Sequence, residues 1–262
     1  MKTLSNYTTT ALSVAKKCGE ILTSYYHKET LSYTKKGYND IATEADIASE
    51  KNAIHMIHNQ FPDHAIYAEE SGKQNSDSPY RWIIDPLDGT TNFKHRLPVF
   101  AVSIALEIKN ELHCGVIYAP KLQELFVAEQ GKGAFLNEQA VHVSSTNGSE
   151  LSLAATGFIP NKPKAYDNLA IWSHVSKSGY PLRRLGAASI DLAYTACGRF
   201  DAFWEFGLHP WDIAAGMLII QEAGGTVTTV DNKPIHVESP SILATNGAIH
   251  NTIQEVIHEA SE

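Results

Sequence analysis

The chain has 262 residues, and 43% of them are hydrophobic, which is enough for a sizeable core in one large domain or two smaller ones. A formal charge of -8 without any basic run argues against a protein whose main task is to bind nucleic acid. The N-terminal segment lacks the continuous apolar core of a signal peptide, and no stretch approaches the ~20 apolar residues that span a bilayer. We therefore expect a cytoplasmic protein without membrane segments.

The cysteine and histidine residues give no sign of a zinc or redox site. Cys18, Cys114 and Cys197 are far apart and form no Cys-x-x-Cys pair, so we expect reduced, half-buried thiols. His55 and His58 have helical spacing, but no third ligand follows at a recognisable distance. Surface histidines are the simpler interpretation.

Two helices are expected at the start of the chain. Apolar residues between Tyr7 and Tyr26 fall largely on one helical face, and a second helical pattern runs from about Thr43 to Asn59. Short β-rich segments follow, separated by turn residues. These segments are residues 65–68, 81–85, 99–108, 114–119 and 124–130. Their hairpin-like spacing predicts a mixed sheet that is largely antiparallel.

Strands and helices alternate in the second half of the chain, after a polar stretch from Ser144 to Glu150. The expected strands are residues 151–157, 182–186, 201–206, 226–229 and 241–246. The expected helices are residues 164–178, 188–197 and 211–223, with a further helix at the end of the chain. This order predicts a layered α/β unit in a second part (143–262) that follows a first part (1–142). Because no Pro- or Gly-rich linker marks the boundary, we expect the two parts to pack tightly.

The most informative segment runs from Trp82 to Phe93. An apolar strand ends here in Asp85 and Asp88, which are followed by a glycine and two threonines. A turn of this composition presents backbone N–H groups beside carboxylates, which suits a divalent cation and a phosphate held side by side. The segment therefore indicates metal-dependent phosphate chemistry.

Four further acids lie where apolar elements end, namely Asp46, Glu69, Glu70 and Asp212. Strand ends and helix starts of an α/β fold converge on the crevice in which ligands bind. Crowded carboxylates repel one another, so either some take up protons, or the cluster does not assemble, or cations bind between them. Hard oxygen ligands favour Mg²⁺, Mn²⁺ or Ca²⁺ over thiophilic metals.

Each acid also has an ordinary structural explanation. Asp46 and Asp212 lie at helix starts, where the exposed N–H groups and the helix dipole favour an acid. The segment Glu69–Gly72 has the composition of a solvated turn, and Asp85–Gly89 that of a β-turn. In the second case a turn and a binding site are compatible, because the turn aims the carboxylates.

Two other candidate sites have weak support. Ser71 and Ser189 lack the Gly-x-Ser-x-Gly setting of a hydrolase nucleophile. The pair Gly224–Gly225 is better explained as the C-terminal stop of a helix than as a phosphate-binding loop.

Several separated motifs closely resemble those of the inositol monophosphatase family. They are Glu69–Ser71, Trp82–Phe93, Trp211–Gly216 and Glu222–Gly225, in that order along the chain. The resemblance implies a layered α-β-α-β-α sandwich of the α/β class, often assembled as a homodimer. It also implies hydrolysis of small phosphomonoesters with two or three Mg²⁺ ions per site, for which Mn²⁺ could substitute and which Li⁺ and Ca²⁺ would inhibit.

The resemblance implies a role for each matching residue. The metal-binding groups would be the carboxylates of Glu69, Asp85, Asp88 and Asp212 and the backbone carbonyl of Leu87. Gly89 and Thr90 would form the phosphate-binding turn, and the Thr90 hydroxyl and Glu70 would orient the attacking water. Asp46 would order Thr90 or a water molecule at the metal.

The resemblance also implies where the alcohol part of the substrate binds. Glu205 would contact substrate hydroxyls, and Gly186, Ala187 and Ala188 would line the pocket, with Asp88 and Asp212 also reaching the substrate. Many relatives carry Ser or Thr where this chain has Ala187, so one hydroxyl contact is missing and an inositol substrate is less strongly indicated. Lys35 and Lys36 lie in a segment that resembles a mobile loop approaching the metals.

The leading functional prediction is a Mg²⁺-dependent phosphatase that acts on myo-inositol monophosphate or a related polyol phosphate by water attack, without a covalent phosphoenzyme. Fructose 1,6-bisphosphate, a 3′-phosphoadenosine nucleotide and histidinol phosphate are alternative substrates, because the alcohol pocket decides between them. A regulatory interaction protein with secondary catalysis is an alternative of another class. Arg183, Arg184 and the aromatic segment 200–206 could line its surface, although core and dimer packing explain that segment more simply.

Overall fold

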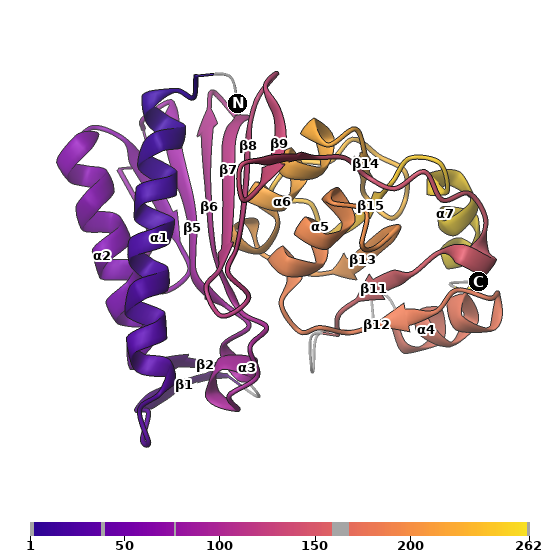
Figure 1. The fold of residues 1–262 in the computed structure, drawn as a ribbon, viewed down its shortest axis with the longest axis horizontal. Helices are drawn as coiled ribbons and strands as arrows, with labels where there is room; N and C mark the ends of the chain where they lie inside the picture. The colour runs from indigo at the N-terminus through magenta and orange to yellow at the C-terminus, as the bar shows by residue number, and fades with distance from the viewer. Residues whose placement is uncertain (1–2, 38–39, 76, 159–167, 261–262) are drawn as a thin grey trace.

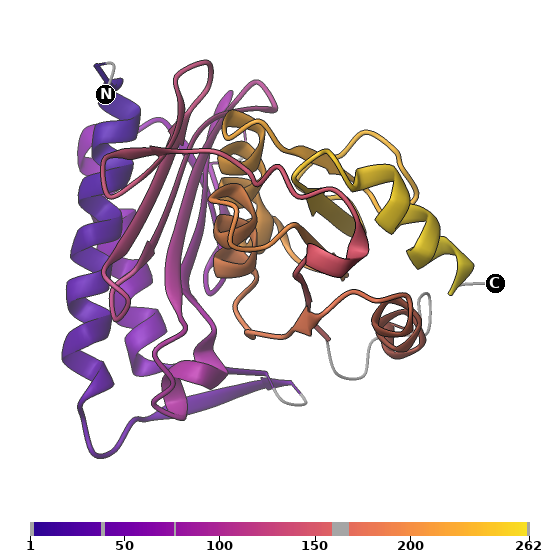
Figure 2. The same ribbon diagram turned by 45° about the vertical axis from the view of Figure 1, so that its right-hand side comes forward.

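The computed structural model describes residues 3–37, 40–75, 77–158 and 168–260. Its helices are α1 (Asn6–Tyr26), α2 (Glu44–Gln60), α3 (Thr90–Lys94), α4 (Asn168–Lys177), α5 (Ala188–Ala196), α6 (Pro210–Glu222) and α7 (His250–Glu259), with a 3₁₀ turn at Ser149–Leu151. Figures 1 and 2 show five layers in the order helices, sheet, helices, sheet, helices. Helices α1 and α2 cover the outer face of one sheet, α5 and α6 lie between the sheets, and α4 and α7 lie outermost on the other side. The expected layered α/β architecture is confirmed.

The larger sheet is built from the first part of the chain. Its strands are β3 (Ala65–Ala68), β4 (Gly72–Gln74), β5 (Tyr80–Asp88), β6 (Ala101–Ile108), β7 (Glu111–Ala119), β8 (Glu124–Glu129), β9 (Gly133–Leu136) and β10 (Gln139–Val141). Their spatial order is β10-β9-β8-β7-β6-β5-β3-β4. All neighbouring strands run antiparallel except β3 and β5, which are parallel. The prediction of a largely antiparallel sheet is correct.

The smaller sheet comes from the second part of the chain. Its strands are β11 (Ala154–Thr156), β12 (Leu182–Arg183), β13 (Ala202–Phe206), β14 (Thr226–Thr228) and β15 (Ser241–Thr245), in the spatial order β12-β11-β13-β15-β14. Strand β11 is parallel to β12 and β13, and the other pairs are antiparallel. The expected strands are present, but some are shorter than predicted; residues 184–186 leave the sheet after Arg183.

Strand β5 carries apolar residues without a polar alternation because both of its faces are covered. Trp82 and Ile84 point into the core under α1 and α2, whereas Ile83 points into the core beneath α5 and α6. The pairing of β5 with β6 shifts register between Asp85 and Asp88. This irregularity ends the strand where the two predicted acids lie.

The central helices hold the two parts of the chain tightly together. Helix α6 is buried along most of its length, because it packs against the larger sheet on one side and against α5 on the other. A methyl group on Gly216 of α6 would lie only 2.5 Å from Cβ of Leu192 in α5. The larger sheet ends at Val141 and the smaller begins at Ala154; the division into 1–142 and 143–262 stays a prediction.

A two-stranded hairpin, β1 (Tyr33–Gly37) and β2 (Asp40–Thr43), was not expected from the sequence. The resemblance predicts only a loop in this segment. All five residues of β1 are exposed, so the strand has no apolar alternation that could mark it. The hairpin extends below the larger sheet, beside α3 (Figures 1 and 2).

The three cysteines are free, as expected. Cys18 and Cys114 are fully buried rather than half-buried, because they lie in the core under α1, and only Cys197 is partly exposed. None of the helices within the described ranges combines the length and the apolar character that crossing a bilayer requires.

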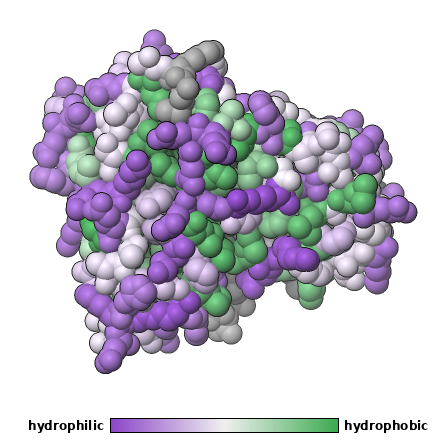
Figure 3. Space-filling view, in the orientation of Figure 1, coloured by the Kyte–Doolittle hydropathy of each residue, from purple (hydrophilic) through white to green (hydrophobic). Residues whose placement is uncertain are grey.

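The surface shown in Figure 3 is hydrophilic over its outer parts, with hydrophobic side chains gathered nearer the middle. The large hydrophobic side chains exposed in the described part of the chain are Tyr33, Ile47, Leu97, Leu151 and Leu169. They come from separate elements, and the homodimer expected from the resemblance stays a prediction.

Candidate active site

The predicted acids Glu69 and Glu70, after β3, and Asp85 and Asp88, on β5, lie at one edge of the larger sheet. Because β3 and β5 are parallel, with Ala68 opposite Ile84, the residues that follow them leave the sheet side by side. The backbone N–H of Glu69 donates to the carbonyl of Ile84 at 3.2 Å. This bond places Glu69 next to Asp85, so strand pairing alone brings these two carboxylates together.

Asp212 reaches the same place from the other part of the chain. Ser103 on β6 is paired with Asp85, and its hydroxyl donates to the carbonyl of Trp211 at 3.1 Å. The Trp211 ring also lies edge-on against Tyr67 of β3, with ring centroids 5.2 Å apart. The start of α6 is thereby fixed over the ends of β3 and β5, and Asp212 faces the other acids.

Asp212 and Asp46 also cap their helices, as the ordinary explanation predicts. Oδ2 of Asp212 accepts the backbone N–H of His209 at 2.6 Å, and Oδ2 of Asp46 accepts that of Thr43 at 2.9 Å. Each bond belongs to a capping box at the start of α6 or α2. Capping therefore orients these carboxylates and does not exclude a role in the site.

Burial and mutual repulsion both raise the pKa values of Asp85, Asp88 and Asp212. Asp85 is fully buried, and burial together with the charges of Glu69, Asp88 and Asp212 holds its pKa well above the usual range. Burial, then Asp88 and Glu69, raises the pKa of Asp212 in the same way. Burial also raises the pKa of Asp88 to about 6, against opposing hydrogen bonds from Ser189. A cation bound among these carboxyl groups would relieve their mutual repulsion.

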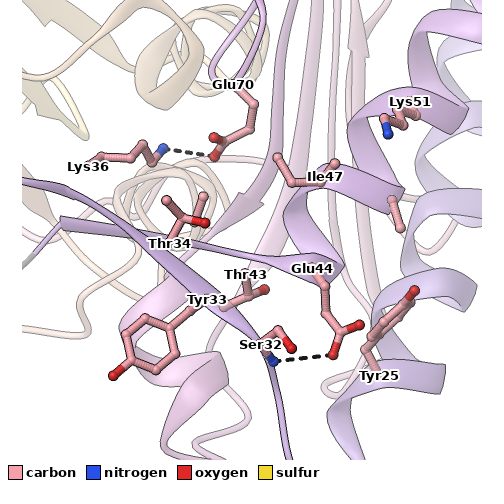
Figure 4. Close-up of a pocket in the computed structure, with 12 residues that line it drawn as sticks. Tyr25, Ser32, Tyr33, Thr34, Lys36, Thr43, Glu44, Ile47, Lys51 and Glu70 are labelled. Atoms are coloured by element: carbon pink, nitrogen blue, oxygen red, sulfur yellow. Dashed lines mark hydrogen bonds and ion pairs between the residues drawn. The ribbon is translucent and has the colours of Figure 1, made fainter.

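Lys36 brings an ammonium group into contact with this cluster. Its Nζ lies 2.7 Å from Oε1 of Glu69 and 2.7 Å from Oε1 of Glu70, and the pair with Glu70 is drawn in Figure 4. Burial raises the pKa of Glu70 to about 7, although the ammonium of Lys36 opposes this shift. The expectation of a solvated turn at Glu69–Gly72 is wrong for these side chains, since that of Glu70 is only 8% exposed. Between Lys35 and Lys36, it is Lys36 that reaches the acids.

A pocket of about 700 Å³ lies beside the acids, on the other side of Lys36. It opens between the hairpin β1–β2 and the helices α1 and α2, and Figure 4 shows Tyr25, Tyr33 and Ile47 on its walls. Lys36 and Glu70 form the edge that it shares with the acidic cluster. The ammonium of Lys36 thus lies between the acidic cluster and this pocket.

Thr90 and Asp46 form a hydrogen-bonded unit next to the cluster. The Thr90 hydroxyl lies 3.1 Å from Oδ1 of Asp46 and 3.0 Å from the carbonyl of Leu87. Burial raises the pKa of Asp46 to about 6, against hydrogen bonds from Thr43. The structure therefore brings Thr90 and Asp46 together, and the carbonyl of Leu87, predicted as a metal ligand, accepts a hydrogen bond from Thr90.

Internal donors engage each predicted metal-binding carboxylate. Lys36 contacts Glu69, the N–H of Leu87 donates to Oδ1 of Asp85 at 2.9 Å, and Ser189 and His209 donate to Asp88 and Asp212. Among the residues that the structure describes, no three His, Cys, Asp or Glu side chains are gathered closely enough to ligate one ion as they stand. The donor set still fits a hard divalent cation, because it consists of buried and partly buried carboxylates in mutual repulsion and already attracts an ammonium group.

The residues predicted to bind the alcohol part of the substrate lie in the second part of the chain. Glu205, on β13, is buried, and its carboxylate fills the space that a side chain at position 157 would occupy, 2.3 Å from an ideal Cβ on Gly157. Ala187 and Ala188 are buried at the start of α5, while Gly186 precedes them with a φ of +79°. The structure places Glu205 within electrostatic reach of Asp212, since it contributes to raising the pKa of that carboxyl.

The structure adds three residues that the sequence did not single out for the site. Ser189 donates to Asp88 from both its N–H and its hydroxyl, although the sequence suggested it only as a poor nucleophile candidate. Asp191 is buried with Oδ1 lacking a hydrogen-bond partner, and burial, followed by the charges of Glu205 and Asp88, holds its pKa well above the usual range. Glu50 accepts the backbone N–H of Glu70 at 2.7 Å. Their place in the sequence gave no signal, because Glu50 and Asp191 lie inside helical patterns and Ser189 lies at the start of one.

The aromatic segment 200–206 does not form a surface. Phe200, Phe203 and Trp204 are buried in the cores around the smaller sheet, so the packing explanation is correct. Arg183 and Arg184 are exposed.

Residues 3–262 match the sequence profile of the Inositol monophosphatase family. The chain belongs to the inositol monophosphatase family. An "Inositol-1-monophosphatase" of Synechocystis sp. is 45% identical over 223 residues, which cover 83% of this chain and 77% of that protein. A "Nus factor SuhB" of Haemophilus influenzae is 40% identical over 95% of this chain and 93% of its own.

A solved structure supports the same assignment. The inositol monophosphatase of Anabaena (Nostoc) sp. PCC 7120 superposes with a TM-score of 0.87 at 40% sequence identity, covering 97% of this chain and 95% of that one. This inositol monophosphatase family member therefore shares its fold with that relative over nearly the whole length of both chains.

Proposed function

We propose that the chain is a Mg²⁺-dependent phosphomonoesterase that hydrolyses myo-inositol monophosphate, or a related small polyol or sugar phosphate, to the alcohol and inorganic phosphate. The observation that supports this most directly is the cluster of Glu69, Asp85, Asp88 and Asp212 at the ends of β3 and β5 and the start of α6. An acidic crevice repels a phosphate dianion, so such a cluster suits phosphate chemistry only when cations bind there first.

The groups that would hold Mg²⁺ are these four carboxylates and the carbonyl of Leu87. Bound Mg²⁺ would supply the positive charge that attracts the phosphate and makes water more acidic. We expect two or three ions per site, with Mn²⁺ as a possible substitute and Li⁺ and Ca²⁺ as inhibitors. The ammonium of Lys36, which contacts Glu69 and Glu70, also contributes positive charge to these two carboxylates.

The side chains beside the cluster are suited to handle the attacking water. Glu70 has a pKa of about 7, so its carboxylate can accept a proton near neutral pH. The Thr90 hydroxyl, which bonds to Asp46 and to the carbonyl of Leu87, would orient that water. The backbone N–H groups of the Gly89–Thr90 turn would stabilise charge on the phosphoryl oxygens.

The choice of inositol monophosphate as leading substrate rests on two features. Relatives 43–45% identical carry the name inositol-1-monophosphatase, and Glu205 offers a buried carboxylate to a polyhydroxylated alcohol. Ala187 provides no hydroxyl, so fructose 1,6-bisphosphate, a 3′-phosphoadenosine nucleotide and histidinol phosphate remain candidates. We propose that the protein acts in the cytoplasm, as a homodimer, and without binding nucleic acid itself.

Phosphate release from each of these four substrates, with Mg²⁺ and with EDTA, tests the proposal. We expect Mg²⁺-dependent release, and a loss of at least ~100-fold in Asp88→Asn and Asp212→Asn, since the loss of an outer partner of a metal ligand already costs about 10- to 100-fold. Asp63→Asn, an exposed carboxylate on the loop after α2, is the control and should keep full activity. Normal turnover by a folded Asp88→Asn protein would contradict the assignment.

A second candidate function is a regulatory role in a larger complex, with catalysis secondary. It is favoured by the name Nus factor SuhB that several relatives carry at 40–42% identity. The exposed pair Arg183 and Arg184 could contribute to a partner surface. If none of the four esters released phosphate in the presence of Mg²⁺, this second candidate would be preferred.

A further inference from the structure

One acid of the site is held by a serine from the other part of the chain. Ser189 lies in the first turn of α5 and has no exposed surface. Its backbone N–H and its hydroxyl both donate to Oδ2 of Asp88, at 2.8 and 2.5 Å. Because both bonds end on the same oxygen, they fix the rotation of the carboxylate without engaging Oδ1.

The start of α5 reaches Asp88 because the turn after β5 leaves room for it. Gly89 has a φ of +85°, and a Cβ at this position would lie 3.3 Å from Cβ of Ala187 and 2.9 Å from the carbonyl of Val99. The side-chain amide of Asn92 donates to the carbonyls of Val99 at 2.8 Å and Leu185 at 2.9 Å. This amide thereby ties the segment before α5 to the turn, so the contact between Ser189 and Asp88 is built into the fold.

The position of Ser189 at the start of α5 allows its hydroxyl to bond outside the helix, because the residue four positions earlier precedes α5. A buried hydroxyl farther along a helix commonly bonds to the carbonyl four residues earlier. Thr195 in the same helix does this, donating to the carbonyl of Asp191 at 2.9 Å. Ser189 instead points out of its helix and bonds to a side chain 101 positions away.

We propose that Ser189 is a positioning residue, whose hydroxyl fixes the carboxylate of Asp88 in the orientation that binds Mg²⁺. The inference rests on the proposed function in one respect, namely that Asp88 is a metal ligand. The side chain of Ala187 lies beside the Gly89 turn, whereas the hydroxyl of Ser189, two residues later, contacts an acid of the cluster.

The test compares Ser189→Ala with Thr195→Val. Each variant loses one buried hydroxyl from α5, but Thr195 bonds only within its own helix. Mg²⁺ affinity is measured by calorimetry on the metal-free proteins, and the Mg²⁺ concentration for half-maximal phosphate release is measured separately. The melting temperature in EDTA shows whether each variant is folded and how much stability it has lost.

We expect Mg²⁺ affinity to fall by about 10- to 100-fold in Ser189→Ala, and the half-maximal Mg²⁺ concentration to rise in parallel. Thr195→Val should keep the affinity of the unchanged protein. At saturating Mg²⁺ the KM of Ser189→Ala should be close to normal, because the hydroxyl acts through Asp88 and not on the substrate.

Unchanged Mg²⁺ affinity in Ser189→Ala, or an equal loss in Thr195→Val, would overturn the inference. The calorimetric result does not depend on turnover, so it separates this inference from the proposed function. If the unchanged protein bound Mg²⁺ and Ser189→Ala bound it more weakly, but no ester was hydrolysed, the proposed function would fail and the role of Ser189 would stand.

Discussion

Lys36 shows how a single residue controls the charge of the acidic cluster. Its ammonium contacts Glu69 and Glu70 at 2.7 Å each. The Lys36 side chain also lines the pocket between the hairpin β1–β2 and the helices α1 and α2. An ammonium group and a divalent cation satisfy the same carboxylate oxygens, so they compete for Glu69. Lys36 is therefore expected to stabilise the metal-free protein and to give way, at least from Glu69, when Mg²⁺ binds.

Lys36→Gln should lower the free energy of unfolding in EDTA by about 1–3 kcal/mol, because two partly buried carboxylates lose their cation. The loss should shrink when Mg²⁺ is added, since the metal replaces the missing charge. Lys35→Gln, an exposed neighbour on the same strand, is the matched control. Urea unfolding of both variants with and without Mg²⁺ checks this; equal behaviour of the two variants would refute the role given to Lys36.

At the scale of elements, the turn between β5 and α3 is the least replaceable part of the site. Gly89→Ala would place a methyl group at a φ of +85° and 2.9 Å from the carbonyl of Val99. We expect a loss of about 2–4 kcal/mol in stability, from the left-handed backbone and from crowding together. Activity should fall as well, because the start of α5 must move away from Asp88.

Gly131→Ala separates these two causes. Gly131 has a φ of +73°, but nothing lies within 4 Å of the added methyl group. Its replacement should cost only about 1 kcal/mol and leave phosphate release unchanged. Thermal unfolding and phosphate release measured on both variants check the comparison, and similar losses in both would mean that crowding at Gly89 does not matter.

Helix α1 is anchored to the larger sheet through one carboxylate. Oε2 of Glu129, on β8, accepts the N–H of Ser5 at 2.9 Å and the hydroxyl of Thr8 at 2.5 Å, and Lys132 lies 2.5 Å from Oε1. Burial alone would raise the pKa of Glu129, but the hydrogen bonds from Lys132, Thr8 and Ser5 outweigh it and lower the pKa to about 2.

The sign of the pH dependence follows from this lowered pKa. A carboxyl that is more acidic in the folded than in the unfolded chain stabilises the fold above its unfolded pKa of 4.5, and this contribution is lost as the pH falls toward 2. Glu129→Gln should therefore be less stable than the unchanged protein at pH 7, and the gap should close as the pH is lowered through this range. Urea unfolding at several pH values tests this; a gap that is constant with pH would show that the charge is not responsible.

For the molecule as a whole, the elements with strong periodic signals were predictable from the sequence. The amphipathic face of α1 and the apolar run of β5 indicate that other layers of the fold cover these elements. The sequence motifs predicted that Glu69, Asp85, Asp88 and Asp212 belong to one site. The hairpin β1–β2 was not predictable, because its first strand is exposed and polar.

The side chains that bond to the acids could not be predicted from the sequence either. The bond from Ser189 to Asp88 and the contact of Lys36 with Glu69 and Glu70 join residues that are 33–101 positions apart. Such contacts depend on the packing of layers, which leaves no local pattern in the residues that form them. The sequence therefore indicates which side chains meet in the site, whereas the structure indicates what holds each of them in place.

The central claim is that the four carboxylates drawn from β3, β5 and α6 form one divalent cation site. Crystals grown with Mn²⁺, which scatters anomalously where Mg²⁺ does not, test it most directly. We expect anomalous peaks between Glu69, Asp85, Asp88 and Asp212, with Lys36 displaced from Glu69. Peaks confined to other parts of the molecule, with Lys36 still in contact with Glu69, would contradict the proposed cation site.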